Sequence, residues 1–306
     1  MIDYILTILL VFFISPLLVG VIKSFKMWLL YKKPLSPFQP YIDFVKLLHK
    51  EVIYSKEASI ISRIAPFFVL SPIIVVMFLL PPIFNGSFYI SFMDAFTITG
   101  LLSLSTFFLM LLGLDSASSF GGIGSSREAF ISALVEPAMI LTLFSVSLIA
   151  QNIGVSKAVL NLNNHFPTHY AASFILAGIS FFILLIAENG RIPVDNPETH
   201  LELTMVHEAM ILDTTGPNLA LIEMAGALKF GIFASLFVSL FLPFGTNLCW
   251  CLAVLVFVIK LLAVSLVVGW IELNTAKLRL FKVPNLLGMA MVFSFLSLII
   301  YYIVGA

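Results

Sequence analysis

The chain has 306 residues, of which 60% are apolar and only 10% are charged. Soluble domains carry about 25% charged residues, and a chain with a mean hydropathy of +1.11 cannot cover its surface with polar groups. The composition therefore excludes a soluble enzyme and predicts an integral membrane protein that contacts the lipid bilayer. Sixteen basic residues balance sixteen acidic ones, so no net charge favours binding to nucleic acid.

Apolar stretches of the length of a membrane span follow one another along the chain. A transmembrane helix needs about 20 mainly apolar residues. Eight such stretches occur, over residues 2–22, 64–84, 94–114, 130–150, 169–187, 219–242, 248–271 and 285–304. No linker or low-complexity tract divides them, so we expect a single all-α membrane domain over residues 1–306, a bundle of about eight transmembrane helices. The first stretch has no basic residue in front of it, which indicates a span and not a cleaved signal peptide.

The basic residues are distributed unequally between the two sides of the predicted bundle. If the N-terminus is outside, thirteen of the sixteen lie in inside segments: Lys23, Lys26, Lys32, Lys33, Lys46, Lys50, Lys56, Arg63, Arg127, Arg191, Lys277, Arg279 and Lys282. Only Lys157 lies in an outside loop, while Lys229 and Lys260 fall within spans. Because basic residues accumulate in cytoplasmic loops, we expect both termini on the periplasmic side of a bacterial inner membrane.

The first inside segment predicts a short amphipathic helix. Pro40 suits the first turn of a helix, and the residues after it show apolar side chains at helical spacing, namely Tyr41, Phe44, Val45 and Leu48. Asp43 and Lys46 lie off this apolar stripe. We expect this helix to lie in the cytoplasmic interface of the membrane.

The densest polar region starts where the fifth predicted span ends. Seven acids, nearly half of the total, lie in it: Glu188, Asp195, Glu198, Glu202, Glu208, Asp213 and Glu223. A start signal at Asn196-Pro197 and a stop signal at Gly216-Pro217 predict a cytoplasmic helix of about 16 residues. Carboxylates this close together would repel one another in a plain solvated loop, so we interpret the region as the lining of a polar cavity or a docking surface.

Metal and cofactor sites find little support in the sequence. His207-Glu208 lacks the second histidine of a zinc-protease helix, and His200 and His207 would lie about 10 Å apart along a helix. Cys249 and Cys251 are too few for an iron–sulfur cluster and point in different directions on a helix, so we expect small packing residues. The sequence predicts neither a catalytic residue nor a metal site in this chain.

A second inside segment, residues 113–128, is rich in glycine and serine. A glycine-rich loop that binds phosphate follows a β-strand in a soluble α/β unit, whereas a membrane span precedes this one. We expect a loop whose backbone packs tightly against neighbouring helices or a partner.

Glu136 is the ionisable residue that stands out within the spans. It lies nine residues after Arg127, which places it about 13 Å deeper, and Pro137 follows it. Ion or proton passage is the usual role of a carboxylate at such depth; the alternative is a buried glutamate held by a hydroxyl or by a lysine. Weaker candidates of the same kind are Glu223, Lys229, Lys260 and Glu272.

Residues 187–198 resemble the signature loop of the H subunit of respiratory complex I, which runs Ala-Glu, two residues, Arg, one residue, Pro-Phe-Asp, one residue, Pro-Glu. Pro37-Phe38-Gln39-Pro40 and the amphipathic stretch after it are similar to the first cytoplasmic loop of that family, and Arg127 and Glu136 match its arginine and membrane glutamate. Residues 199–210 look like the loop of the membrane subunits of formate hydrogenlyase and hydrogenase-4, the group 4 nickel–iron hydrogenase branch. The chain departs from complex I in Val194, which replaces Phe, in the missing Gly-Pro-Asn element of the first loop, and in residues 213–216, which replace Glu-Tyr-Ser-Gly.

The resemblance implies a non-redox membrane subunit of an oxidoreductase complex that is not catalytic alone. Its implied partners are an iron–sulfur small subunit, a large hydrogenase-like subunit of the peripheral arm, and antiporter-like membrane subunits. Iron–sulfur clusters and a nickel–iron centre would belong to those partners, no cofactor would be bound by this chain, and quinone binding is left open. The implied function is to anchor the arm and to relay protons through buried carboxylates.

The residue pattern and the family resemblance together assign roles to two groups of residues. The predicted proton or ion relay consists of Glu136, Glu188, Asp195, Glu198, Glu202, Asp213, Glu223, Lys229 and Lys260. The residues predicted to organise the loops or dock the arm are Arg127, Arg191, Pro193, Pro197, His200, His207, Glu208, Gln39, Asp43, Lys46 and Glu51. Arg191 is expected to hold the acidic loop by charge-assisted hydrogen bonds.

Two other functions stay open. The chain could be the quinone-chamber subunit of an NADH:quinone oxidoreductase. It could also be an independent secondary ion transporter, although the paired interrupted spans that are typical of transporters are not evident.

Overall fold

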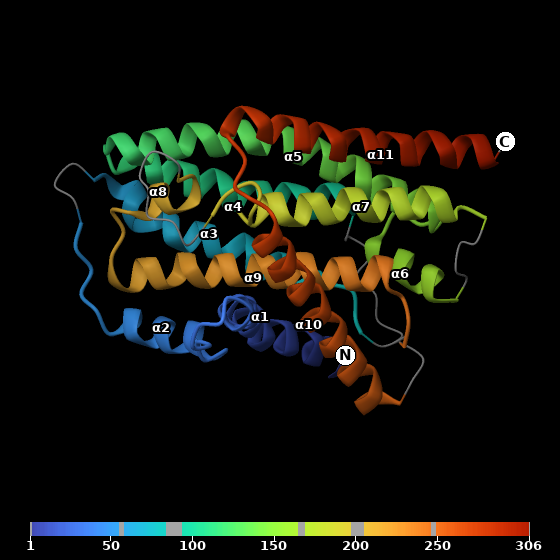
Figure 1. Ribbon diagram of the computed structural model, residues 1–306, viewed down its shortest axis with the longest axis horizontal. Helices are drawn as coiled ribbons and strands as arrows, with labels where there is room; N and C mark the ends of the chain where they lie inside the picture. Colours follow the sequence, from blue (N-terminus) through green and yellow to red (C-terminus); the bar gives the residue numbers. More distant parts are fainter. Residues whose placement is uncertain are drawn as a thin grey trace.

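The computed structural model describes residues 2–54, 58–83, 94–164, 169–196, 205–245 and 249–305. Within these ranges every regular element is a helix (Figure 1). Eight helices are long and apolar enough to cross a membrane. They are α1 (Ile2–Leu29), α3 (Ile60–Phe78), α4 (Ala95–Asp115), α5 (Ser119–Ile149), α7 (Ala171–Glu188), α9 (Gly216–Phe241), α10 (Trp250–Asn274) and α11 (Val283–Gly305). The all-α membrane fold that the sequence predicts is confirmed.

Four shorter elements complete the described chain: α2 (Gln39–Leu48), α6 (Val155–Asn164), α8 (His207–Ile211) and the 3-10 turn η1 (Leu280–Lys282). Helices α2 and α8 lie at the end of the molecule opposite to the two chain termini (Figure 1). We call it the α8 end.

Several element boundaries differ from the predicted ones. Helix α5 begins at Ser119, so most of the glycine-rich segment that we expected as a loop forms its first turns, capped by Ser118, whose hydroxyl accepts a hydrogen bond from the Gly121 amide at 3.1 Å. Helix α6 lies in the outside connection between the fourth and fifth predicted spans. The predicted cytoplasmic helix is observed only as α8, and residues 197–204 at its start lie outside the described residues.

Helix α2 forms where the sequence predicts it, with Pro40 in its first turn. Its orientation corrects one detail of the expected apolar stripe. Tyr41, Phe44 and Leu47 are half-buried, whereas Val45 and Leu48 are exposed. The helix contacts α1 and α9 with the first group and presents the second group outward.

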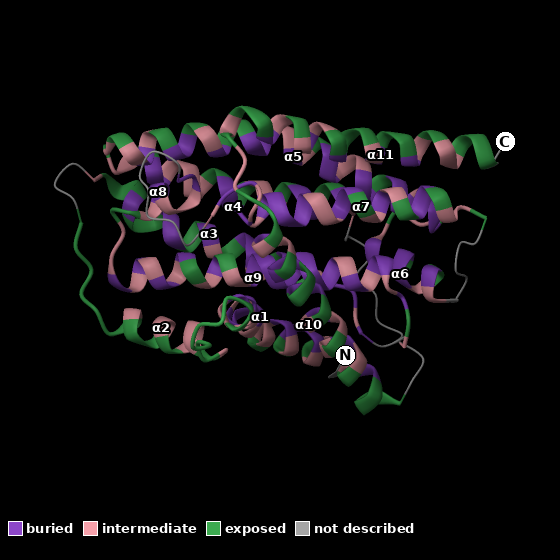
Figure 2. Ribbon diagram, in the orientation of Figure 1, coloured by how far each residue is buried: buried purple, intermediate pink, exposed green. Residues whose placement is uncertain are grey.

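Helix α9 is the central element of the bundle. Helices α1, α2, α3, α7 and α10 all contact it, and buried residues occur along its whole length (Figure 2). Phe230 and Phe233 of α9 and Phe181 of α7 are among the largest fully buried side chains. Helices α10 and α11 expose much more apolar surface (Figure 2), as expected for helices that face lipid or a partner subunit.

Cys249 and Cys251 are both exposed at the start of α10. We expected small packing residues, and neither thiol packs in the core of this chain. The first turns of α10 project away from the neighbouring helices (Figure 1), and that position leaves both thiols uncovered.

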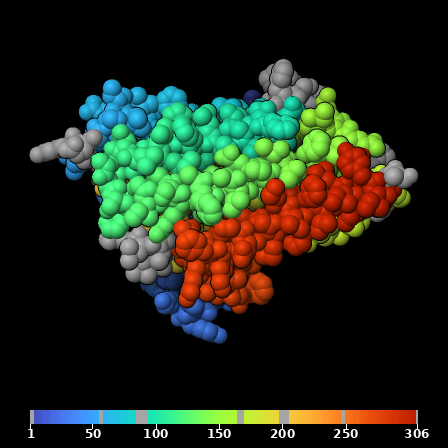
Figure 3. Space-filling view, turned by 90° about the horizontal axis from the view of Figure 1, so that it is seen from above, coloured from blue at the N-terminus to red at the C-terminus, as the bar shows by residue number. Residues whose placement is uncertain are grey.

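Helix α11 lies along α5 and α7 on one face of the molecule (Figure 3). Serine hydroxyls join α7 and α11 by hydrogen bonds: Ser173 donates to the carbonyl of Ser297 at 2.6 Å, and Ser180 donates to the carbonyl of Ala290 at 2.8 Å. Small hydroxyl residues that bond across an interface are typical of helix packing in membranes.

Helices α1 and α9 approach closely at Gly231. A Cβ atom at this position would lie 1.8 Å from Oγ and 2.6 Å from Cβ of Ser15 on α1. Gly226, on the same helix, has open space at the equivalent point, with no atom within 4 Å. The absence of a side chain at Gly231 therefore sets the distance between the central helix and α1.

The substitution Gly231→Ala should lower the free energy of unfolding by about 1–3 kcal/mol, because it overpacks the contact with Ser15. Gly226→Ala is the matched control and should leave stability unchanged or slightly improved. Denaturant unfolding of the full chain in detergent micelles, followed by circular dichroism, measures both. Equal unfolding midpoints for Gly231→Ala and the wild type would contradict the close contact.

Candidate functional site

A cavity of about 450 Å³ lies at the α8 end, between α1, α2, α3, α4, α8, α9 and the segment that follows α7. Apolar residues of the spans line one part of it, among them Val19, Ile73, Leu109 and Phe230. Its charged lining residues are Lys23, Asp43, Lys46, Lys50, Glu188, Arg191, Asp195, His207, Glu208, Glu223 and Lys229. A cavity that combines an apolar wall with convergent charges is the usual form of a binding or transfer site.

The structure brings part of the predicted site together. Of the predicted relay residues, Glu188, Asp195, Glu223 and Lys229 line the cavity. Of the residues predicted to organise loops or dock the arm, Asp43, Lys46, Arg191, His207 and Glu208 line it. Pro197, Glu198, His200 and Glu202 lie outside the described residues.

Glu188 and Lys229 form a buried ion pair in the wall of the cavity. Lys229 Nζ lies 2.9 Å from Glu188 Oε1, and the two side chains are 7% and 9% exposed, the glutamate being the less exposed of the two. Glu188 is the last residue of α7 and Lys229 lies in the middle of α9, so the pair joins the end of one span to the interior of another. Removing one partner would leave a buried charge without compensation.

Helix α7 ends in a Schellman motif. The amide of Gly190 donates to the carbonyl of Ala187, and the amide of Arg191 donates to the carbonyl of Ile186. Gly190 has a φ of 55°, and the ring of His207 packs against it so closely that a Cβ would lie 2.6 Å from Nδ1. A glycine is therefore required here both for the turn and for the contact.

Among the described residues, Arg191 pairs with Glu272 of α10. Its Nη1 lies 3.4 Å from Oε1 of Glu272, and Lys26 Nζ lies 2.8 Å from Oε2 of the same carboxylate, which is fully buried. The guanidinium also lies over the ring of Phe230, 5.2 Å from its centroid. The turn at Gly190 directs the chain back toward the bundle and brings Arg191 to Glu272. Glu198 and Glu202 lie outside the described residues, so the expected hydrogen bonds from Arg191 to the acidic loop stay a prediction.

Asp195 holds the acidic segment through hydrogen bonds to its backbone and to Lys277. Its Oδ2 accepts hydrogen bonds from the amides of Val206 and His207 at 3.2 and 3.3 Å, and its Oδ1 accepts one from Lys277 Nζ at 2.6 Å. Burial alone raises the pKa of Asp195, but the neighbouring His207 and Lys277 outweigh that effect and hold the pKa well below its usual range. The carboxylate therefore stays ionised and ties both ends of the segment that contains residues 197–204.

His207 lies between two carboxylates. Its Nε2 is 3.5 Å from Oε1 of Glu128 on α5, and its Nδ1 is 3.8 Å from Oδ2 of Asp195. Burial lowers the pKa of His207, but the negative charges of Glu128 and Asp195 outweigh it and raise the pKa to about 9. The ring is therefore an imidazolium near neutral pH.

Glu128 is a site residue that the sequence analysis missed. It is 1% exposed and follows Arg127 on the buried face of α5. The small residues Gly121, Gly124 and Ser125 lie on the same face, and this helical spacing could have marked Glu128 as buried.

The short helix α8 rests on that face. A Cβ atom at Gly124 would lie 2.9 Å from Cβ of Ala209 and 2.9 Å from the carbonyl oxygen of Val206. Arg127 Nη1 donates to the carbonyl of Met205 at 3.0 Å. The expectation that the glycine-rich segment serves close backbone packing is thus confirmed.

The remaining predicted relay residues lie apart from the cavity lining. Glu136 is half-buried on α5, and Asp213 is exposed after α8. Lys260 donates to the carbonyls of Leu242, at 2.6 Å, and Phe244, beyond the last residue of α9 and away from the α8 end.

Gln39, Glu51 and Pro193 of the predicted loop-organising group lie outside the cavity lining, as does Arg127. Gln39 Nε2 donates to Asp43 Oδ1 at 2.9 Å, which orients one acid of the lining. The backbone carbonyl of Glu51 packs against Gly216, and the carbonyl of Pro193 accepts a hydrogen bond from the Leu278 amide at 2.9 Å. Groups of three or more side chains able to hold a metal ion are absent from the described ranges.

Comparison with known proteins assigns the chain to a protein family. Residues 30–303 match the NADH dehydrogenase family. The chain belongs to this family. It is 32% identical over 234 residues to hydrogenase-4 component C of Escherichia coli (strain K12), a match that covers 76% of this chain and 72% of that one. It is 26% identical over 296 residues to formate hydrogenlyase subunit 4 of the same organism, with 95% of each chain covered.

More distant similarities agree with this placement. An H subunit of the NADH-quinone oxidoreductase of Symbiobacterium thermophilum is 29% identical over 178 residues, which cover 56% of this chain and 52% of that protein. A chain of the membrane-bound sulfane sulfur reductase, an archaeal respiratory membrane complex, superimposes with a TM-score of 0.84 over 98% of both chains at 16% identity. The resemblance to the complex I H subunit family and its hydrogenase branch is confirmed, and the chain shares the fold of the solved structure.

Replacing Lys229 by Met should lower the free energy of unfolding by about 3–5 kcal/mol, because Glu188 is left buried without its partner. The double substitution Glu188→Gln with Lys229→Met should recover much of this loss, since no uncompensated charge remains. Denaturant unfolding in micelles measures both variants.

Lys32→Met is the matched control, because Lys32 is exposed between α1 and α2. It should change stability by less than about 0.5 kcal/mol. A Lys229→Met variant as stable as the control would show that the pair does not compensate a buried charge.

Proposed function

We propose that this chain is the membrane-anchoring and ion-coupling subunit of a multisubunit, complex I-like oxidoreductase of the formate hydrogenlyase or hydrogenase-4 type. The observation that carries the proposal is the cavity at the α8 end, where acids and bases of α7, α8 and α9 meet beside an apolar wall. The similarity to hydrogenase-4 component C and to formate hydrogenlyase subunit 4 supports this branch of the family.

In this proposal the α8 end is cytoplasmic, and both termini face the periplasm of a bacterial inner membrane. The distribution of basic residues supports this orientation. The iron–sulfur small subunit and the large hydrogenase-like subunit of the arm dock on the α8 end, and antiporter-like subunits lie beside the spans. Exposed apolar residues on the outer face of α2, such as Ile42, Val45 and Leu48, offer part of the docking or lipid-facing surface.

The proposed relay starts at the cavity. The pair of Glu188 and Lys229 forms its entrance beside the fixed negative charge of Asp195, and Glu136 carries protons further into the membrane. A buried carboxylate paired with a lysine responds strongly to any change in nearby charge or hydration. Redox events in the arm would supply such changes, so that protons move although this chain carries no electrons.

The chain's own residues do not fit an iron–sulfur cluster. A cluster needs about four thiolate ligands, whereas Cys249 and Cys251 are exposed together at the start of α10, away from the cavity. The proposal therefore assigns the clusters and the nickel–iron centre to the partner subunits.

One observation favours a second candidate, the quinone-chamber subunit of an NADH:quinone oxidoreductase. The cavity volume of about 450 Å³ lies within the range of small-molecule pockets, and Pro16, Phe44 and Phe230 give it apolar surface. Mass spectrometry of the proteins that copurify with the chain distinguishes the candidates. A nickel–iron subunit supports the first, and a quinone-type NADH module supports the second. The chain alone would indicate an independent transporter.

In the assembled complex, Glu136→Gln should leave the turnover of the arm with a soluble dye largely intact, because the arm chemistry does not use this residue. Ion translocation should fall by about a hundredfold, the order expected when a positioned proton carrier is removed. Proteoliposomes that contain the whole complex allow both measurements.

Glu136→Asp is the matched variant, because it keeps a carboxyl group on the same turn of α5. It should retain part of the translocation. Unchanged translocation in Glu136→Gln would exclude the relay role of this residue.

A further inference from the structure

Glu128 has no role in the relay proposed above, yet it is a buried charged residue next to the cavity, at 1% exposure. Its Oε2 has no hydrogen-bond partner in the described part of the chain. Its Oε1 lies 3.5 Å from Nε2 of His207. A carboxylate in this position depends on the charge of the imidazolium, because it lacks the hydrogen bonds that would otherwise compensate burial.

Several segments place charges around His207. Glu128 on α5 and Asp195 after α7 face the ring, and Lys277, before η1, binds Asp195. Glu188 and Lys229, on α7 and α9, lie further away and compensate each other. With an imidazolium, the four groups Glu128, Asp195, His207 and Lys277 sum to zero. Without it they leave one negative charge in a buried site.

We propose that Glu128 is a proton-uptake site whose protonation is controlled by the position of His207 on α8. While α8 is seated, the imidazolium compensates the carboxylate and both groups are ionised. When α8 moves away, one proton from the water that replaces the ring binds the carboxylate and gives a neutral carboxylic acid. Return of the imidazolium releases that proton, so each cycle takes up and returns one proton and changes no other bond.

Two observations favour a movable partner over a static ion pair. The contacts of the ring with Glu128 and Asp195, at 3.5 and 3.8 Å, are longer than hydrogen bonds, and Nδ1 of His207 is also without a hydrogen-bond partner in the described residues. The ring is 27% exposed and lines the cavity, whereas Glu128 is closed off behind it.

Helix α8 packs against α4 and α5, so its movement has to break a defined set of contacts. It has five residues, its first amide is held by Asp195, Arg127 binds the carbonyl just before it, and its inner side rests on Gly124. The inference rests on the proposed function in one respect only, namely that a partner docked at the α8 end supplies the movement. The charge compensation of Glu128 does not depend on any partner.

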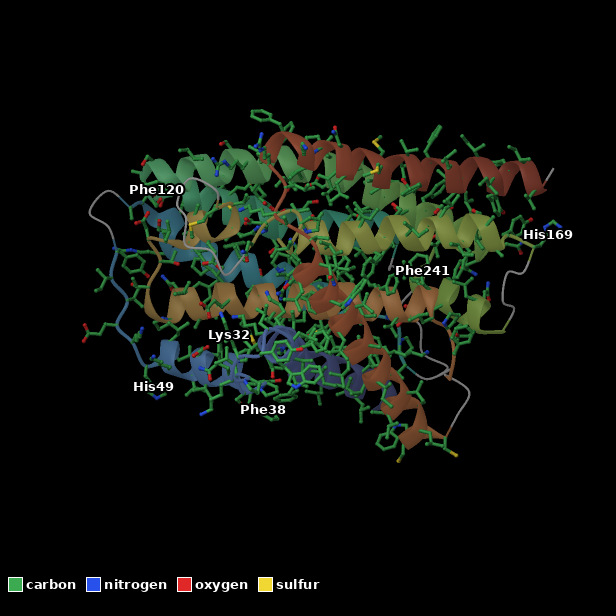
Figure 4. All side chains as sticks on the ribbon, in the orientation of Figure 1. Lys32, Phe38, His49, Phe120, His169 and Phe241 are labelled. Carbon is green, nitrogen blue, oxygen red and sulfur yellow. The ribbon has the colours of Figure 1, made fainter. Side chains whose placement is uncertain are left out.

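Infrared spectroscopy of the full chain in lipid nanodiscs tests the compensation. In His207→Gln at neutral pH, the carbonyl band of a protonated carboxyl group should appear, and it should disappear in the double substitution Glu128→Gln with His207→Gln. His49→Gln is the matched control and should give no such band, since His49 lies on the outer side of α2 (Figure 4). A folded His207→Gln variant without the band overturns the proposal.

A second measurement decides the question if His207→Gln does not fold. Nitrogen-15 magnetic resonance of the imidazole rings should show His207 titrating near the value of about 9 that its neighbours produce. In Glu128→Gln the imidazolium loses a negative neighbour, so this value should fall by about one to three pH units. An unchanged pKa of His207 in this variant would mean that Glu128 and His207 do not interact electrostatically, and the proposal would be wrong.

These outcomes are independent of ion translocation. If Glu136→Gln fails to stop translocation while the infrared and titration results appear as expected, the proposed relay through Glu136 fails and the Glu128 site stands. If the reverse occurs, only the Glu128 site is excluded.

Discussion

The arrangement of the α8 end follows from the free-energy cost of burying a charge inside a helical bundle. An ionised group away from water needs an opposite charge or several hydrogen bonds, and the described structure meets this need mainly across elements. Glu272 of α10 binds Lys26 of α1, Glu188 of α7 binds Lys229 of α9, and Asp195 binds Lys277 beyond α10. Each pair joins segments that are distant in the sequence, so the charges position the helices as well as the site.

The cavity is a consequence of the same pairing. Where charges converge from four or more elements, side chains cannot fill the space as apolar residues do, and a polar volume next to the apolar wall of α1, α3 and α9 results. The central helix α9 supplies both kinds of lining, Phe230 on one turn and Lys229 beside it. Ionisable groups next to such a volume can exchange protons with water while the rest of the bundle stays dry.

The sequence predicts well what depends on local properties. Span length and hydropathy locate all eight spans, and Pro40 marks the start of α2. The early start of α5 was missed because glycine has low intrinsic helix propensity, and packing against α8 overrides it. The partner of Arg191 was missed for a different reason: Glu272 lies 81 residues further along the chain, and no spacing rule connects the two.

Two carboxylates on α5 divide the tasks that the proposals assign to this helix. Glu128 and Glu136 are eight residues apart, which corresponds to about 12 Å along the axis and to roughly 80° around it. The first therefore faces α8 and its imidazolium, while the second lies on a half-exposed face beyond the cavity lining. In the proposed assembly, a helix with this arrangement presents one proton-binding group to the arm side and another to the neighbouring membrane subunits, and its rigid backbone fixes the distance between them.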